Sequence, residues 1–274
     1  MASEKKVVYE RSAQPIIQAG RLTAPLNSNV GHQGAVVSEH EREKLKGVAR
    51  SSAVDPQQVA IRYQLARTTA ETFSSAGTEL LAIGQIFGPD RVNGLSSGGN
   101  GSDEIVAVSL LLRIAGQLVS AVADLFSDGR HYAAAALLRQ LVEVEYLAWA
   151  FDARDSEAER WLRSTAEERC DFFTPAKLRK AAQGKFRSQD YGHHCEMGGH
   201  PVPRSAILLN GDEITCQLLV SDLLGHTGRI WDHLLDWSAN QPWALPIHTR
   251  KEAMHAAYVE WKKADKLLEL PPPP

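Results

Sequence analysis

Residues 131–153 read HYAAAALLRQLVEVEYLAWAFDA, and this stretch decides the fold class. Alanine and leucine occupy several faces of the helix that it predicts over about residues 131–152. A helix that is apolar nearly all round has to be covered by other elements. We therefore expect it to be the most buried helix of an all-α protein.

Two long helices are predicted before this stretch. Asp55 is a good N-cap, and the apolar residues over 59–81 recur every three or four positions, so a helix runs to about residue 88. Ser102 caps the next helix, and Asp128 with the following glycine ends it.

Start signals also mark helices after residue 153. Thr165 and Glu168 have the spacing of a capping box, and Thr249 and Glu252 repeat that spacing before a last helix to about residue 269. Between them, the apolar residues that follow Asp212 predict another long helix.

These elements predict an all-α fold: an antiparallel helical bundle of four to five long helices, with short helices inserted at about 155–200. Residues 1–50 are weakly patterned, so we expect a flexible N-terminal arm. Residues 51–270 are expected to form a single helical domain. The PPPP run at 271–274 predicts an extended tail.

The composition narrows the class of protein. The net charge of −3 lacks the basic character of a duplex-binding domain, so duplex DNA is not an expected partner. Charges such as Glu104, Arg113 and Asp124 interrupt the most apolar stretch, so no membrane segment is expected. With three cysteines and no secretory leader pattern, we expect a cytoplasmic protein without a disulfide framework.

Polar residues inside the apolar stretch mark a candidate site. Arg139 and Glu143 stand four residues apart on one helix face and can pair. A charged pair in such surroundings needs further hydrogen-bonding partners. Tyr191 and Cys195, with the same spacing, and His200, which precedes a proline, are the candidates.

The motifs YAAAALLRQLVEVEYLAWAF and FRSQDYGHHCEMGGHP resemble a bacterial family of unknown function, with an R-x3-E helix followed by Y-x3-C-x4-H-P. That family is similar to HEPN proteins. The resemblance implies an RNA-binding or RNA-cleaving homodimer in a defence or toxin context, with Arg139, Glu143, Tyr191, Cys195 and His200 as catalytic candidates. HEPN ribonucleases carry R-x(4–6)-H, and Arg250 with His255 and Arg187 with His193 or His194 have this spacing, which is also frequent by chance.

A basic segment directly precedes the second motif. It is the best candidate for contact with RNA, although a solvated run of charge has the same appearance. Its cationic residues are Lys177, Arg179, Lys180, Lys185 and Arg187.

Three other interpretations stay open. A zinc ion could be held by His194, Cys195 and His200 in a metal-dependent hydrolase, although no cofactor is the first expectation. Cys195 beside a histidine could act as a nucleophile. The polar cluster could also be structural, in a non-enzymatic helical interaction module that forms a homodimer. Arg229 and His233, four residues apart, are expected on a solvated face.

Overall fold

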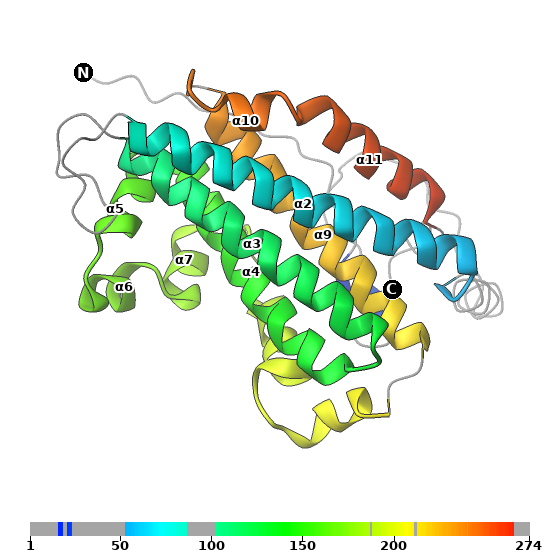
Figure 1. Cartoon of the computed structure of the whole chain (residues 1–274). Helices are drawn as coiled ribbons and strands as arrows, with labels where there is room; N and C mark the ends of the chain where they lie inside the picture. The colour runs from blue at the N-terminus through cyan, green and yellow to red at the C-terminus, as the bar shows by residue number, and fades with distance from the viewer. Residues whose placement is uncertain are drawn as a thin grey trace, which may run out of the picture.

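The computed structural model of the chain describes residues 16–18, 21–23, 53–86, 102–186, 188–210, 213–239 and 241–265, and it is an all-α fold (Figure 1). Four long helices form its centre: α2 (Pro56–Ile86), α3 (Asp103–Ser127), α4 (His131–Ala153) and α9 (Glu213–Ser238). The described residues do not include most of the expected N-terminal arm, Arg187 or the proline tail.

Shorter elements complete the fold. The corner expected at 155–200 holds α5 (Glu157–Arg163), α6 (Ala166–Phe172), α7 (Pro175–Ala181), α8 (Ser188–His194), the π-helix η1 (Cys195–Gly199) and the 3-10 helix η2 (Pro203–Leu208). The chain then closes with α10 (Leu245–His248) and α11 (Lys251–Ala264). Within the expected arm, β1 (Ile16–Gln18) and β2 (Arg21–Thr23) form an antiparallel pair that the sequence did not predict.

Most of the local start signals are confirmed. Asp55 accepts from two backbone N–H groups, Ser102 accepts from Ile105, and Thr165 with Glu168 makes both bonds of a capping box. The prediction of a second capping box, at Thr249 and Glu252, is wrong. Thr249 Oγ1 donates to a carbonyl of α10, and α11 begins only at Lys251.

A tight turn makes α3 and α4 antiparallel neighbours. Gly129 takes a φ of +72°, which glycine adopts without steric strain. The backbone N–H of Arg130 donates back to Leu125 at 2.8 Å and closes the end of α3. The predicted stop at Asp128 and Gly129 is confirmed.

α9 departs from the antiparallel arrangement. Its residues pair with α2 and α4 in the same order along each chain: Gln217 with Arg62, Trp231 with Phe73, and His226 and His233 with Glu145 and Asp152. α9 therefore runs parallel to both helices (Figure 1). Parallel neighbours cannot be joined by a short loop, so the chain has to return along the bundle between α4 and α9. We call the described residues of this connection, 154–186 and 188–210, the crossover.

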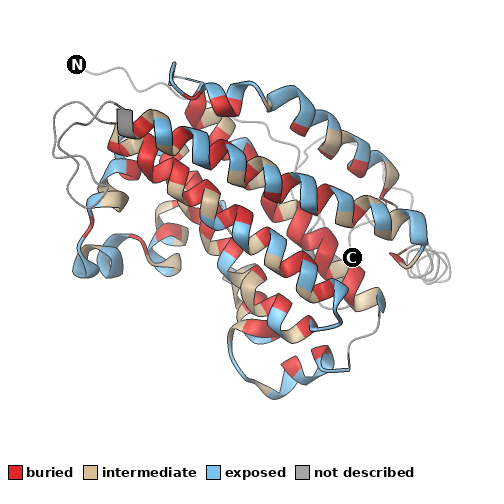
Figure 2. Ribbon diagram, in the orientation of Figure 1, coloured by how far each residue is buried: buried red, intermediate tan, exposed pale blue. Residues whose placement is uncertain are grey.

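Each long helix buries the face that it turns toward the other helices of the bundle. The buried faces of the long helices meet along the bundle, and the outer faces of α2 and α11 are exposed (Figure 2). α9 buries a larger part of its length than α4, contrary to our expectation. The reason is that buried polar residues such as Ser221 and Thr227 made α9 look less apolar than α4.

One helix meets the length and composition test for a membrane span, contrary to the expectation that charges would exclude every segment. It is α3, which is long and apolar enough to cross a membrane. Packing inside the bundle buries 61% of its most apolar stretch, as in the core helix of a helical bundle.

Candidate functional site

The second motif reaches the bundle through α8 and η1. A Cβ atom at Gly198 would lie 2.4 Å from the backbone nitrogen of Ala136, so only glycine permits this approach to α4. The backbone N–H of His200 donates to Cys195 at 2.9 Å, which closes the π-turn. This geometry directs neighbouring side chains of the motif to two different sites.

The first site, the Arg139 cluster, consists of Arg139, Glu143, Tyr191 and Cys195. Arg139 Nη2 donates to the Tyr191 hydroxyl at 2.6 Å and lies 2.8 Å from Glu143 Oε1. The Tyr191 hydroxyl donates to Glu143 at 2.8 Å, and Arg139 Nε lies 3.4 Å from Cys195 Sγ. The structure thus brings together four of the five residues predicted for catalysis.

His200 is separate from this cluster. Its backbone is extended, as expected before a proline, and its side chain is exposed. Within the described ranges, that side chain makes no hydrogen bond or ion pair. The expectation that His200 closes the Arg139–Glu143 pair is therefore not met.

The cluster lies at the edge of the core. Arg139 is 25% exposed and Glu143 33%, so solvent reaches both. Burial, followed by the bond to Glu143, raises the pKa of Tyr191 to about 12. Burial opposes the charge of Arg139, but Cys195 and Glu143 outweigh it and raise the pKa of the guanidinium. The phenol is therefore neutral and the guanidinium charged near pH 7.

The basic segment contributes one residue to the same place. The Arg179 guanidinium carbon lies 4.4 Å from the centre of the Tyr191 ring, and that of Arg139 lies 5.3 Å from it. Two guanidinium groups therefore stack on one aromatic ring. Lys177, Lys180 and Lys185 are exposed.

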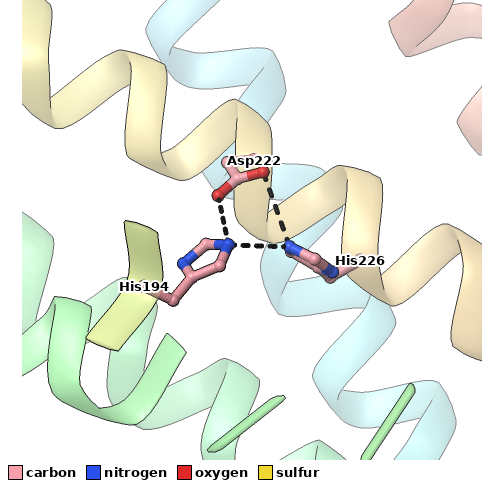
Figure 3. A group of neighbouring side chains, drawn as sticks. All are labelled: His194, Asp222 and His226. Carbon is pink, nitrogen blue, oxygen red and sulfur yellow. Dashed lines mark hydrogen bonds and ion pairs between the residues drawn. The ribbon is translucent and has the colours of Figure 1, made fainter. Parts of the chain in front are cut away.

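The second site, the core cluster, was not predicted. Arg229 donates to Glu145 through Nε at 2.7 Å and Nη2 at 3.1 Å, and Glu145 Oε2 lies 2.5 Å from His226 Nδ1. His226 Nε2 then faces His194 of α8 and Asp222 of α9 (Figure 3). Glu145, His194, Asp222 and His226 are each at most 5% exposed.

Opposite charges meet inside this cluster. Burial opposes ionisation of Glu145, but Arg229 and His226 outweigh it and hold the pKa of the carboxyl below its usual range. Burial, followed by the nearby imidazole of His226, holds the pKa of His194 well below 6.5. His194 is therefore a neutral imidazole near pH 7, which is the form that binds metals.

The group of potential metal ligands in the structure differs in part from the group expected from the sequence. His194, Asp222 and His226 each offer one ligand atom, and these atoms lie within 4.8 Å of one another. Of the zinc ligands considered from the sequence, His194 belongs to this group, whereas Cys195 faces Arg139 and His200 is exposed. A local spacing could not reveal ligands that come from a different helix.

Several other residues considered from the sequence lie outside the Arg139 cluster. Arg250 pairs with Glu79 at 2.6 Å, and His255 is exposed on α11, so this R-x4-H pair forms no common cluster. The prediction of a solvated face for Arg229 and His233 is wrong, because His233 is buried and pairs with Asp152 at 3.0 Å.

The i, i+4 spacing of Asp222 and His226 was the one signal in the sequence that pointed to the core cluster.

Comparison with family models, with curated proteins and with solved structures finds no significant match to this chain.

Proposed function

We propose that the protein binds RNA, and that the phosphate groups of the RNA are held by Arg139 and Arg179 beside Tyr191. The observation that carries the proposal is the placement of two guanidinium groups on one tyrosine ring at a partly exposed site. Arginine recognises phosphate through its planar set of N–H donors. Lys177 and Lys180 are exposed on α7, the helix that carries Arg179.

The charges support an anionic ligand. Glu143 pairs with Arg139, whereas none of the described residues forms a hydrogen bond or an ion pair with Arg179. Arg179 Nη1 is shielded from solvent without a hydrogen-bond acceptor in the described part of the chain. The site therefore has one positive charge in excess, which a phosphate group can balance.

The same geometry favours binding over cleavage. Ribonuclease chemistry without a metal needs a general acid and base whose pKa values lie near the working pH. Tyr191, with a pKa of about 12, and the charged Arg139 are unsuited to proton transfer near pH 7. The side chain of His200, the histidine among the five candidates, is exposed and makes no hydrogen bond or ion pair with the cluster within the described residues.

The test measures binding of fluorescent single-stranded RNA to the purified chain by anisotropy over a range of salt concentrations. Loss of one phosphate contact in Arg179→Gln should weaken binding and lower the slope of log affinity against log salt by about 0.7. Arg67→Gln is the control, because Arg67 is exposed on α2. Equal affinity and slope for Arg179→Gln and the unmodified chain would refute the proposal.

Cleavage is measured in the same samples, with and without chelator. We expect the RNA to remain intact in both conditions, and His200→Ala to bind as the unmodified chain does. Cleavage that survives chelator and disappears in His200→Ala would instead place catalysis at the second motif.

A further inference from the structure

We propose that His194, Asp222 and His226 form a zinc site between the crossover and α9. Two imidazole nitrogens and one carboxylate oxygen are a donor set that zinc accepts. In Figure 3 the three side chains point toward a common centre, His194 from α8 and the other two from adjacent turns of α9. The proposal rests on a different set of residues from the RNA site.

The separations between the two imidazole nitrogens and the Asp222 carboxylate are in the range of a tetrahedral site. His194 Nε2 lies 3.2 Å from His226 Nε2 and 3.4 Å from Asp222 Oδ2, and the other carboxylate oxygen, Oδ1, lies 3.6 Å from His226 Nε2. Ligands at about 2.0–2.2 Å from zinc in a tetrahedron are roughly 3.3–3.6 Å apart. An octahedral magnesium site would bring neighbouring oxygens to about 3.0 Å.

The surroundings of His226 resemble those of a metal ligand. A histidine that binds a metal through one nitrogen usually donates its other N–H to a carboxylate, which fixes its tautomer. Glu145 is that carboxylate, 2.5 Å from His226 Nδ1, and two bonds from Arg229 hold it in place. The lone pair of His226 Nε2 is thereby directed at His194 and Asp222.

A proton could occupy the centre in place of an ion. His194 Nε2–H would then donate to His226 Nε2 at 3.2 Å, and the three side chains would form a closed network without metal. The two alternatives predict different contents of the purified protein. Zinc replaces this proton, so its uptake has to release protons and to weaken as the pH falls.

The chain supplies three ligands. Within the described ranges, no further histidine, cysteine or carboxylate atom joins the group of His194, Asp222 and His226. Three protein ligands leave the fourth position to water or a small molecule. Because His194 belongs to the crossover and the other two to α9, the ion would also join these segments.

The test begins with the full-length chain as purified and measures zinc by elemental analysis. We expect roughly one zinc per chain, removal by a strong chelator with a lower melting temperature, and recovery on adding zinc alone. Cobalt added to the chelated chain should give the intense visible absorption of a four-coordinate ion. A chain that contains no zinc, takes up neither ion and keeps its melting temperature would overturn the proposal.

Variants then locate the ion. His226→Gln and Asp222→Asn should lose zinc, and Glu145→Gln should bind it about 10–100-fold more weakly because it positions His226. His200→Gln is the control, since His200 is exposed and outside the site. If a ligand variant fails to fold, the cobalt spectrum of the unmodified chain still decides. Equal zinc in His226→Gln and His200→Gln would place the ion elsewhere and overturn the assignment.

Discussion

Glu145 and His226 connect two helices that run parallel, with Oε2 of the carboxylate 2.5 Å from Nδ1 of the imidazole. Both residues are almost completely buried, and Arg229 provides the counter-charge. A buried carboxylate of this kind contributes little net stability when paired, but leaves an uncompensated charge when its partner is removed. The core cluster therefore stabilises one arrangement of α4, α9 and the crossover.

Glu145→Gln should lower the free energy of unfolding by about 3 kcal/mol, because Arg229 and His226 lose a buried counter-charge. Urea unfolding at pH 7 measures the change. Glu143→Gln is the comparison on the same helix, and there the loss should stay below about 1 kcal/mol, since Glu143 is 33% exposed. Equal losses in the two variants would contradict a special role for the core cluster.

The stability of the metal-free chain should fall as the pH drops below 6.5. The unfolded chain takes up a proton at His194 near its ordinary pKa of 6.5, whereas the folded chain does not. Stability from this group is therefore present above pH 6.5 and is lost as the pH falls toward the depressed pKa, by up to about 1.4 kcal/mol per pH unit.

Urea unfolding in the presence of chelator, between pH 7.5 and 5, measures this slope. His194→Gln should remove a large part of it, the remainder belonging to His193, whose pKa is also lowered by burial, and His200→Gln should leave it unchanged. Glu145, whose pKa is also lowered, adds a second loss that begins below its ordinary value of 4.5. A flat profile between pH 7 and 5.5 would show that His194 is accessible to protons in the folded chain.

Local signals predicted much of the fold. The caps at Asp55, Ser102 and Thr165 depend on hydrogen bonds to residues two or three positions away, so a short stretch of sequence determines them. The Arg139–Glu143 pair was predicted for the same reason. The direction of α9 depends instead on where the crossover returns, and no local pattern encodes that path.

The core cluster could not be predicted because its residues lie far apart in the sequence. Glu145 and His226 are separated by 81 positions, and His194 belongs to a third segment. Asp222, His226 and Arg229 also resemble a solvated face when each is considered without its partners. Their burial follows from charge balance across the bundle, which hydrophobic periodicity does not represent.

The contact between α2 and the end of α11 provides another prediction. Arg62 and Asp265 form a bidentate pair at 2.8 and 2.7 Å, and they are 0% and 1% exposed. Asp265→Asn should lower the free energy of unfolding by about 3 kcal/mol, because the Arg62 charge loses its counter-ion.

Asp128→Asn is the control, since Asp128 pairs with Arg130 in solvent and its loss should stay within about 1 kcal/mol. A double variant, Arg62→Met with Asp265→Leu, should recover part of the loss because no buried charge remains. If the double variant is less stable than Asp265→Asn, the pair itself contributes net stability.

Gly198→Ala should disturb both sites at once. The added methyl carbon would lie 2.4 Å from the nitrogen of Ala136 and 2.5 Å from the carbonyl carbon of Ala135, and these backbone atoms of α4 cannot move aside. The clash has to shift η1, which joins Tyr191 and His194 to the bundle. We expect a loss of about 2 kcal/mol in the free energy of unfolding, together with weaker RNA binding and less bound zinc.

Gly192→Ala separates this effect from the general consequence of replacing a glycine. A Cβ atom at Gly192 meets nothing within 4 Å, and alanine favours the helix by roughly 0.5–1 kcal/mol. This variant should be at least as stable as the unmodified chain and should keep both ligands. If Gly198→Ala matches Gly192→Ala in urea unfolding and in zinc content, η1 does not pack tightly on α4, and Tyr191 and His194 must be positioned by other contacts.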